Sequence, residues 1–293
     1  MPEFLPSFIQ AFFIIALAPL SIGITKKTKA LLQNRFGASI LQPYFDLFKW
    51  WHKEIIYSPI ATYVFTFAPI IFLATTIIAT LLLSNQFIIW NVGDVFVLLY
   101  FLAAGRFFMT IAALDTATTF GGMGASREVY LATLIEPVML LAVLSVFKTT
   151  DTSLLANISV FSATQPINIS TTLAMLGFFM LLLAENGRIP IDNPDTHLEL
   201  TMIHEGMTIE YSGRLLVFIH IAAYTKQLLF CILFANLFFV GTLPVMLKIF
   251  LTLILLGISE TLNNKMRLFR IPNYIVIAGI LIILSLISHK TIL

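Results

Sequence analysis

Four ionisable side chains lie within long apolar stretches of the chain: Arg106, Glu136, His220 and Lys226. A charge inside a lipid bilayer is costly unless it is paired or hydrated. A helical rise of about 1.5 Å per residue places Arg106, Glu136 and Lys226 roughly 10, 13 and 18 Å from the inner ends of their stretches. Acids and bases at staggered depths can relay protons. The alternative is buried ion pairing that fixes helix packing, for example between Glu136 and Arg106 or Lys226.

The densest polar segment is AENGRIPIDNPDTHLELTMIHEGMTIEYSGR, residues 184–214. Its ionisable side chains are Glu185, Arg188, Asp192, Asp195, His197, Glu199, His204, Glu205 and Glu210. A metal site is one candidate, but no second histidine follows His204 at the spacing of the zinc-protease signature. We therefore predict a hydrated vestibule lined by acids, or a docking surface, and no metal site.

The elements that position these groups must be membrane-spanning helices. Of the 293 residues, 59% are hydrophobic and 11% are charged, whereas soluble domains carry about 25% charged residues. So few polar residues cannot coat a soluble core of this size. The single Cys231 excludes a disulfide framework, a zinc ribbon or an iron–sulfur cluster held by this chain alone. The net charge of +2 is too small to indicate a nucleic-acid partner.

Apolar runs long enough to cross a bilayer predict an all-α, polytopic membrane protein with about eight transmembrane helices. We expect a single transmembrane domain, residues 1–293, whose weakest span is 170–184. The predicted spans are 4–24, 60–83, 95–113, 129–147, 170–184, 215–238, 244–259 and 273–288.

The basic residues predict the orientation of these spans. Loops 25–59, 114–128, 185–214 and 260–272 together hold twelve of the 17 basic residues. Such an excess marks the cytoplasmic side of a membrane protein. Both termini are therefore expected outside. The twelve are Lys26, Lys27, Lys29, Arg35, Lys49, Lys53, Arg127, Arg188, Arg214, Lys265, Arg267 and Arg270.

The first cytoplasmic loop contains an amphipathic pattern from Ile40 to Glu54. The polar side chains Asp46, Lys49 and Lys53 share one face, and apolar side chains recur on the other. This spacing favours an interfacial amphipathic helix at headgroup depth, although a plain surface anchor would show the same pattern. The apolar residues are Leu41, Tyr44, Phe45, Phe48, Trp50 and Trp51.

Three motifs lie in order along residues 20–270: LQNRFG…LQPYFDLFKWWHKE, LDTATTFGGMGASRE and AENGRIPIDNP…LEL…EYSG. They resemble the membrane-anchor subunit (also called chain 1) that respiratory NADH:quinone oxidoreductase, or complex I, shares with the energy-converting hydrogenases. FGGMGASRE and HLELTMIHEGMTIEYSGR are most similar to the anchor subunit of formate hydrogenlyase and to hydrogenase-4 component C. Ala38 stands where the family generally has Pro. Ala223, before Tyr224, stands where the quinone branch commonly has Glu.

Individual residues have expected roles, none of them catalytic, which the resemblance implies or, for Arg106, its position within a span indicates. The expected proton-coupling residues are Arg106, Glu136, Glu185, Asp192, Glu199, Glu205, Glu210 and Lys226. The residues expected to dock a peripheral electron-transfer arm are Arg35, Asp46, Lys49, Glu54 and Arg127.

The function that the resemblance implies is that of a membrane anchor and proton-coupling subunit in a hydrogenase-type respiratory complex of the cell inner membrane. No cofactor is expected in this chain. A [NiFe] centre and iron–sulfur clusters are expected in partners, namely hydrogenase-like large and small subunits and an iron–sulfur subunit. Antiporter-like membrane subunits and the lipid bilayer are further expected partners. The alternatives are the chain 1 subunit of an NADH:quinone oxidoreductase, which would line a quinone cavity, and a stand-alone secondary transporter.

Overall fold

The structure, a computed structural model, describes residues 4–58, 60–83, 94–150, 153–155, 168–193, 202–239 and 244–290. Throughout these ranges the chain is helical or irregular, and its sole β-type contact is an isolated bridge between Asp94 and Leu154. Seven helices are long and apolar enough to span a membrane, and α7 is a shorter apolar helix. The prediction of an all-α polytopic membrane protein is confirmed.

The helices follow the predicted spans closely, and one further short helix precedes each of α9 and α11. Their bounds are α1 Phe4–Leu32, α2 Gln42–Trp51, α3 Tyr63–Leu83, α4 Val95–Asp115, α5 Thr119–Thr150, α7 Ile169–Glu185, α8 His204–Thr208, α9 Gly213–Phe238, α10 Val245–Leu262, the 3₁₀ helix η1 Leu268–Arg270 and α11 Ile271–Lys290.

Three helices extend three or more residues beyond the predicted spans. α1 continues to Leu32 and does not end at residue 24, so the first part of the predicted loop 25–59 is helical. α5 begins at Thr119 and not at residue 129, because the glycine-rich motif is itself helical. α10 continues to Leu262, so Glu260, at the start of the predicted loop 260–272, is a buried residue of the helix. In all three places hydropathy marks where the apolar run changes, whereas the backbone hydrogen bonds continue into the polar residues.

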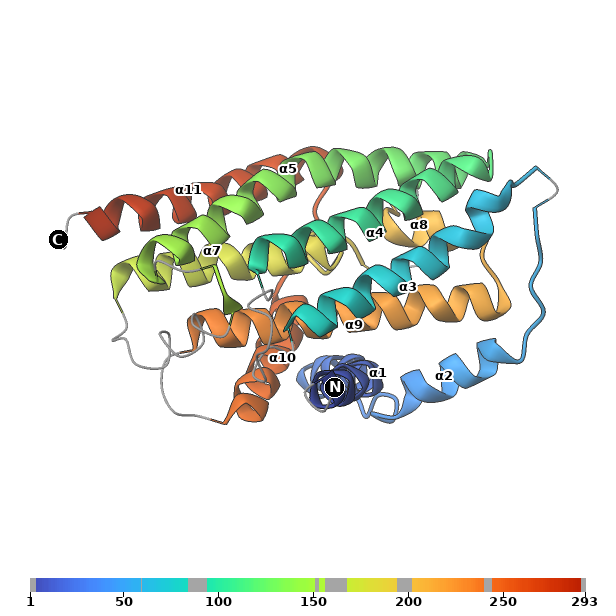
Figure 1. The fold of residues 1–293 in the computed structure, drawn as a ribbon, viewed down its shortest axis with the longest axis horizontal. Coiled ribbons are helices and arrows are strands. Elements are labelled where there is room, and N and C mark those ends of the chain that lie inside the picture. The colour runs from blue at the N-terminus through green and yellow to red at the C-terminus, as the bar shows by residue number, and fades with distance from the viewer. Residues whose placement is uncertain are drawn as a thin grey trace.

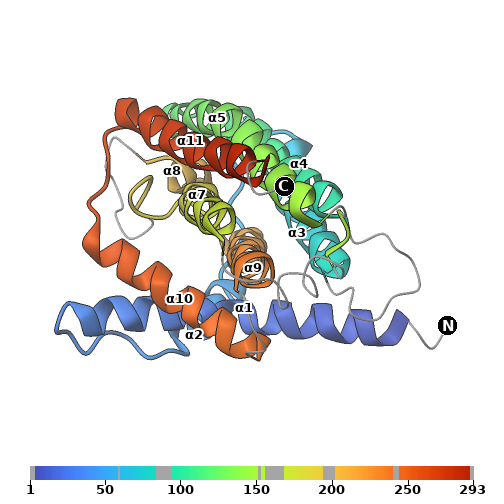
Figure 2. The same ribbon diagram turned by 90° about the vertical axis from the view of Figure 1, so that its left-hand side faces the viewer.

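Helix α9 is the centre of the bundle. Figure 2 looks along α7 and α9 and shows α3, α4, α5 and α11 on one side, with α1, α2 and α10 on the other. Residues 228–235 of α9 are all buried, as expected for a helix surrounded by others. α1 crosses beneath the bundle, seen end-on in Figure 1 and lengthwise in Figure 2.

The predicted amphipathic helix is present as α2, which lies outside the main bundle (Figure 1). Trp50 stacks on His220 of α9, with ring centroids 4.5 Å apart. The Tyr44 hydroxyl donates a hydrogen bond to the Ala16 carbonyl oxygen of α1 at 2.5 Å. Phe45 and Phe48 stay exposed. α2 is thus held on α1 and α9, and its aromatic face remains open.

Candidate functional site: a buried charge cluster beside a polar cavity

The site is centred on Glu185, the last residue of α7. Its carboxylate accepts from the Arg106 guanidinium of α4 at 2.8 Å and from the Lys226 ammonium of α9 at 2.8 Å. Lys226 also donates to the Glu185 backbone carbonyl oxygen at 2.9 Å. All three residues are buried. Each cation therefore has an acceptor, as a buried charge requires.

Glu136 of α5 extends this cluster to the edge of the bundle. Its carboxylate lies 2.5 Å from the second terminal nitrogen of Arg106, while 45% of its side chain is exposed. The buried-pair alternative is thus realised between Glu136 and Arg106, whereas Lys226 pairs with Glu185. We call Glu136, Arg106, Glu185 and Lys226 the coupling cluster. It joins four helices, and its two acids and two bases balance in formal charge.

A second group of charges lies on the other side of α9. Arg188 donates to the side-chain oxygen of Gln227, the residue after Lys226, and contacts Glu260 of α10 at 3.3 Å. Glu260 also lies 3.7 Å from Lys29 near the end of α1. Polar side chains therefore continue from the α4–α5 edge of the bundle to the α1–α10 edge.

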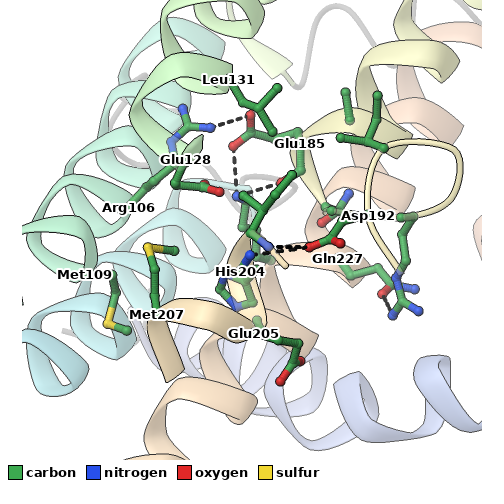
Figure 3. A pocket seen from close by; sticks show the side chains of 18 of the residues that line it. Arg106, Met109, Glu128, Leu131, Glu185, Asp192, His204, Glu205, Met207 and Gln227 are labelled. Atoms are coloured by element: carbon green, nitrogen blue, oxygen red, sulfur yellow. Dashed lines mark hydrogen bonds and ion pairs between the residues drawn. The ribbon is translucent and has the colours of Figure 1, made fainter. Parts of the chain in front are cut away.

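A cavity of about 110 Å³ lies between the two groups. Its walls include Arg106, Glu128 and Glu185 on one side, and Asp192 and Gln227 on the other (Figure 3). A water molecule needs roughly 10–15 Å³, so the cavity has room for several. Its size and its acidic walls are compatible with the predicted vestibule, whose hydration stays a prediction.

Asp192 fixes the segment that covers the cavity. Its carboxylate lies 2.9 Å from the Lys265 ammonium and accepts hydrogen bonds from the backbone N–H groups of Ile203 and His204 at 3.2 and 3.4 Å. These contacts join the end of the α7 segment to the start of α8. His204 and Glu205 of α8 are thereby placed in the cavity wall.

The glycine-rich motif allows α8 to approach α5. A Cβ atom on Gly124 would lie 3.0 Å from the backbone of Gly206 and of Ile203, too close for an unshifted neighbour. Arg127 supports the same contact by donating to the Met202 carbonyl oxygen at 3.0 Å. Closely spaced glycines can serve a tight turn or a close approach of two backbones, and here they allow close backbone approach inside a helix.

The start of α9 is held against α3 by Tyr211. Its ring stacks on Phe65 at 4.1 Å, and its hydroxyl donates to the Phe65 carbonyl oxygen at 3.1 Å. Burial, together with the nearby Asp115 carboxylate, raises the pKa of Tyr211 above its ordinary value. The hydroxyl therefore remains a hydrogen-bond donor at neutral pH, and its contact with Phe65 fixes the start of α9 relative to α3.

The structure brings most of the predicted proton-coupling residues together. Arg106, Glu136, Glu185 and Lys226 form the coupling cluster, and Asp192 and Glu205 line the cavity beside it. Two predicted residues are not part of this arrangement. Glu210 lies in the turn after α8 and is not among the described cavity-lining residues, and Glu199, like Asp195 and His197, lies outside the described residues.

The predicted docking residues lie mostly in the first loop, away from the cavity. Arg35, Lys49 and Glu54 are exposed, while Asp46 is half-buried and accepts a hydrogen bond from Gln42 at 3.0 Å. Arg127 is the exception. It lies on α5, where it holds the segment before α8.

Several polar residues of the site have no counterpart in the predicted set. Glu128 faces the cavity. It directly follows Arg127, which was assigned to docking. Glu260 and Lys265 fall in the predicted loop 260–272. A carboxylate directly after an apolar run was the available signal for Glu260. The residues added by the structure are Lys29, Glu128, Arg188, Gln227, Glu260 and Lys265.

Fold and site together define a class: a polytopic helical membrane protein with a buried line of acids and bases beside a polar cavity. The NADH dehydrogenase family model matches residues 6–290, nearly the whole chain. The chain belongs to this family.

Relatives in two kinds of respiratory complex are similar to most of the chain. Formate hydrogenlyase subunit 4 of Escherichia coli is 33% identical over 210 residues, which cover 70% of this chain and 67% of that protein. Hydrogenase-4 component C of the same organism is 30% identical over 235 residues, covering 78% and 73%. An NADH-quinone oxidoreductase subunit of Rickettsia prowazekii is 29% identical over 262 residues, covering 82% and 75%. The resemblance to the hydrogenase relatives, inferred from three motifs, is confirmed.

A solved structure shares the fold. It is that of the membrane-bound sulfane sulfur reductase, an archaeal respiratory membrane complex. One of its chains superposes with a TM-score of 0.85 at 19% identity, covering 97% of this chain and 100% of that chain.

Proposed function

We propose that this chain is the membrane anchor and proton-coupling subunit of a hydrogenase-type respiratory complex, similar to formate hydrogenlyase and hydrogenase-4. The observation that carries the proposal is the coupling cluster. It runs without a break from a hydrated cavity next to the polar segment 184–214 to a half-exposed carboxylate at the bundle edge. Such a line is suited to passing a charge change from one end to the other.

The coupling cluster is balanced so that a proton gained at one end alters its whole length. Glu185 shares its charge between Arg106 and Lys226, and Arg106 is in turn shared with Glu136. If Glu185 takes up a proton from the cavity, its carboxyl group becomes neutral and its ion pair with Arg106 weakens. Arg106 can then bind Glu136 more strongly. A charge change in the cavity therefore reaches the α4–α5 edge without movement of any helix.

The exposed edge of the cluster supports an additional membrane partner. Glu136 lies within a span, and 45% of its side chain is uncovered. A carboxylate so placed is costly against lipid. We propose that a neighbouring membrane subunit, of the antiporter-like kind, covers this edge and receives the charge change there.

The first loop supports the docking of a peripheral arm. Phe36 is 94% exposed at the tip of the loop, beside Arg35, and its carbonyl oxygen accepts a hydrogen bond from Lys27 at 2.5 Å. Exposed aromatic and arginine side chains are typical anchors of protein interfaces. We propose that hydrogenase-like large and small subunits and an iron–sulfur subunit bind on this side. It would face the cytoplasm of an inner membrane, with both termini outside.

The metal centres are assigned to those partners because this chain does not fit them. Iron–sulfur and nickel–iron sites need several thiolates, whereas the sole cysteine, Cys231, is buried in the apolar centre of α9. The described residues also contain no group of three or more potential metal ligands.

The alternative, a subunit that lines a quinone cavity, is less well supported. The cavity of about 110 Å³ is smaller than the 300–1,000 Å³, roughly, of pockets for drug-sized ligands. Ala223, in the cavity wall, also stands where the quinone branch commonly has a carboxylate. Bound quinone in the purified complex would favour the alternative.

Glu136→Gln tests the proposed function. We expect the complex to assemble, because Arg106 keeps Glu185 as its partner, and proton movement per electron pair to fall by roughly tenfold or more, since a proton-transferring group is lost. The measurement is proton movement in inverted membrane vesicles, set against hydrogenase turnover with a soluble dye.

Thr133→Val is the matched control for Glu136→Gln. Thr133 is exposed on α5 one turn earlier and bonds only to its own helix at Tyr130 in the described structure. The Thr133→Val substitution should therefore leave proton movement unchanged. Normal proton movement in an assembled Glu136→Gln complex would contradict the relay.

A further inference from the structure

Glu260 is a buried acid that does not line the cavity. It lies in the last turn of α10 with 5% of its surface exposed. Its two carboxylate oxygens face different cations, Arg188 at 3.3 Å and Lys29 at 3.7 Å. Neither the apolar pattern nor the resemblance assigns it a role. Burying a carboxylate together with two cations costs desolvation free energy, so this position is costly unless the pairing matters.

Arg188 is the residue through which Glu260 reaches the site. It lines the cavity and donates to Gln227, the neighbour of Lys226. Glu185 already forms ion pairs with Arg106 and Lys226, and Asp192 already forms one with Lys265. Arg188 is thus a further cation beside two carboxylates, Glu185 and Asp192, that already have counter-charges, and Glu260 is the carboxylate with which it forms an ion pair.

We propose that Glu260 is a positioning residue for proton coupling, which keeps the Arg188 guanidinium directed away from the cavity carboxylates. The inference rests on the proposed function. Without the charge of Glu260, the buried guanidinium would turn to the nearest acids, which include Glu185, Asp192 and Glu128 around the same cavity. An added cation favours the ionised form of a carboxylate. The cavity acids would then resist taking up a proton.

The same contact connects the site with the first loop. Lys29 lies three residues before the end of α1 at Leu32, and the docking loop follows directly. α1 and α10 are in close contact at this point, because a Cβ atom on Gly257 would lie 2.1 Å from the Thr28 hydroxyl oxygen. The line Lys29, Glu260, Arg188 and Gln227 therefore connects the end of α1, next to the docking loop, with the cavity wall.

Glu260→Gln in the intact complex tests this inference. Proton movement per electron pair should fall by roughly tenfold, the order by which one added cation changes the protonated fraction of a carboxylate. Dye-linked turnover of the peripheral arm should persist. Glu260→Asp keeps the charge and should retain coupling.

The double variant Arg188→Gln/Glu260→Gln separates positioning from packing. It removes both charges, so no unbalanced guanidinium remains, and coupling should return to near the normal level. Assembly is scored separately on native gels, and coupling is normalised to the assembled complex. If Glu260→Gln alone fails to assemble, the double variant decides. An assembled double variant that remains uncoupled overturns the inference, as does normal coupling in assembled Glu260→Gln.

Glu136→Gln is measured in parallel so that the two proposals can fail separately. If Glu136→Gln uncouples the complex and Glu260→Gln does not, the proposed function stands and the role of Glu260 is wrong. If both variants pump normally, the relay itself is wrong.

Discussion

Glu185→Gln is expected to destabilise the chain by about 3–5 kcal/mol, the usual cost of removing one partner from a buried ion pair. The change leaves Lys226 with the Glu185 backbone oxygen as its acceptor, and Arg106 with Glu136 alone. The coupling cluster would carry a net positive charge in the interior. Coupling should also be lost, because the carboxylate between the two cations is the step that joins the cavity to Glu136.

The stability effect is measured by thermal unfolding of the detergent-solubilised complex and by the amount of chain that accumulates in the membrane. Lys226→Met added to Glu185→Gln restores charge balance and should recover much of the lost stability, without recovery of coupling. Glu136→Gln is the matched control: the same substitution at the end of the cluster, where Arg106 keeps Glu185 as its partner, should cost clearly less than Glu185→Gln. Equal stability losses in Glu185→Gln and Glu136→Gln would contradict the central position of Glu185.

The helices were predictable because the bilayer imposes one dominant rule. About 20 apolar residues are needed to span it, and the runs that meet this rule became helices in the structure. The twelve basic residues outside those runs marked one side. The depths of the ionisable groups were inferred from helical rise and stay a prediction.

The pairing of those groups was not predictable in the same way. Glu185 was assigned to a loop, because the apolar run ends at residue 184, yet both Arg106 and Lys226 converge on it. α7 has 17 residues, so its end lies among neighbouring helices that extend beyond it. Which side chains on different helices meet depends on how α4, α7 and α9 pack. This packing cannot be inferred from the sequence of any single helix.

Glu260 and the glycine-rich motif could not be interpreted from the sequence for a related reason. Glu260 directly follows an apolar run, which places it near a helix end, but only the position of α1 across α10 shows that it is buried beside Lys29. Gly124 is compatible with a turn or with close approach, and only the position of α8 decides between them. The docking residues of the first loop, in contrast, were assigned by resemblance, and the exposure of Arg35, Lys49 and Glu54 is compatible with that role.

Gly23→Ala should detach the peripheral arm although Gly23 lies within α1, away from the exposed docking residues. A Cβ atom there would lie 1.9 Å from the backbone oxygen of Ile40 and 2.8 Å from its carbonyl carbon. Because the obstacle is backbone, the loop before α2 must move as a whole. Alanine is the better helix former by about 1 kcal/mol, so α1 itself should remain intact. The variant therefore displaces the docking surface without removing any of its side chains.

The arm retained by Gly23→Ala is measured as the stoichiometry of peripheral subunits that co-purify with a tag on this chain. Loss of at least half of the arm is expected, as it is for Arg35→Ala and Asp46→Ala, which remove docking side chains directly. Gly122→Ala is the matched control, because it adds the same methyl group to a helical glycine with no neighbouring atom within 4 Å. It should leave the arm in place. If Gly23→Ala retains a full arm, the loop around Ile40 is not the docking surface, and Arg35 and Asp46 would need another role.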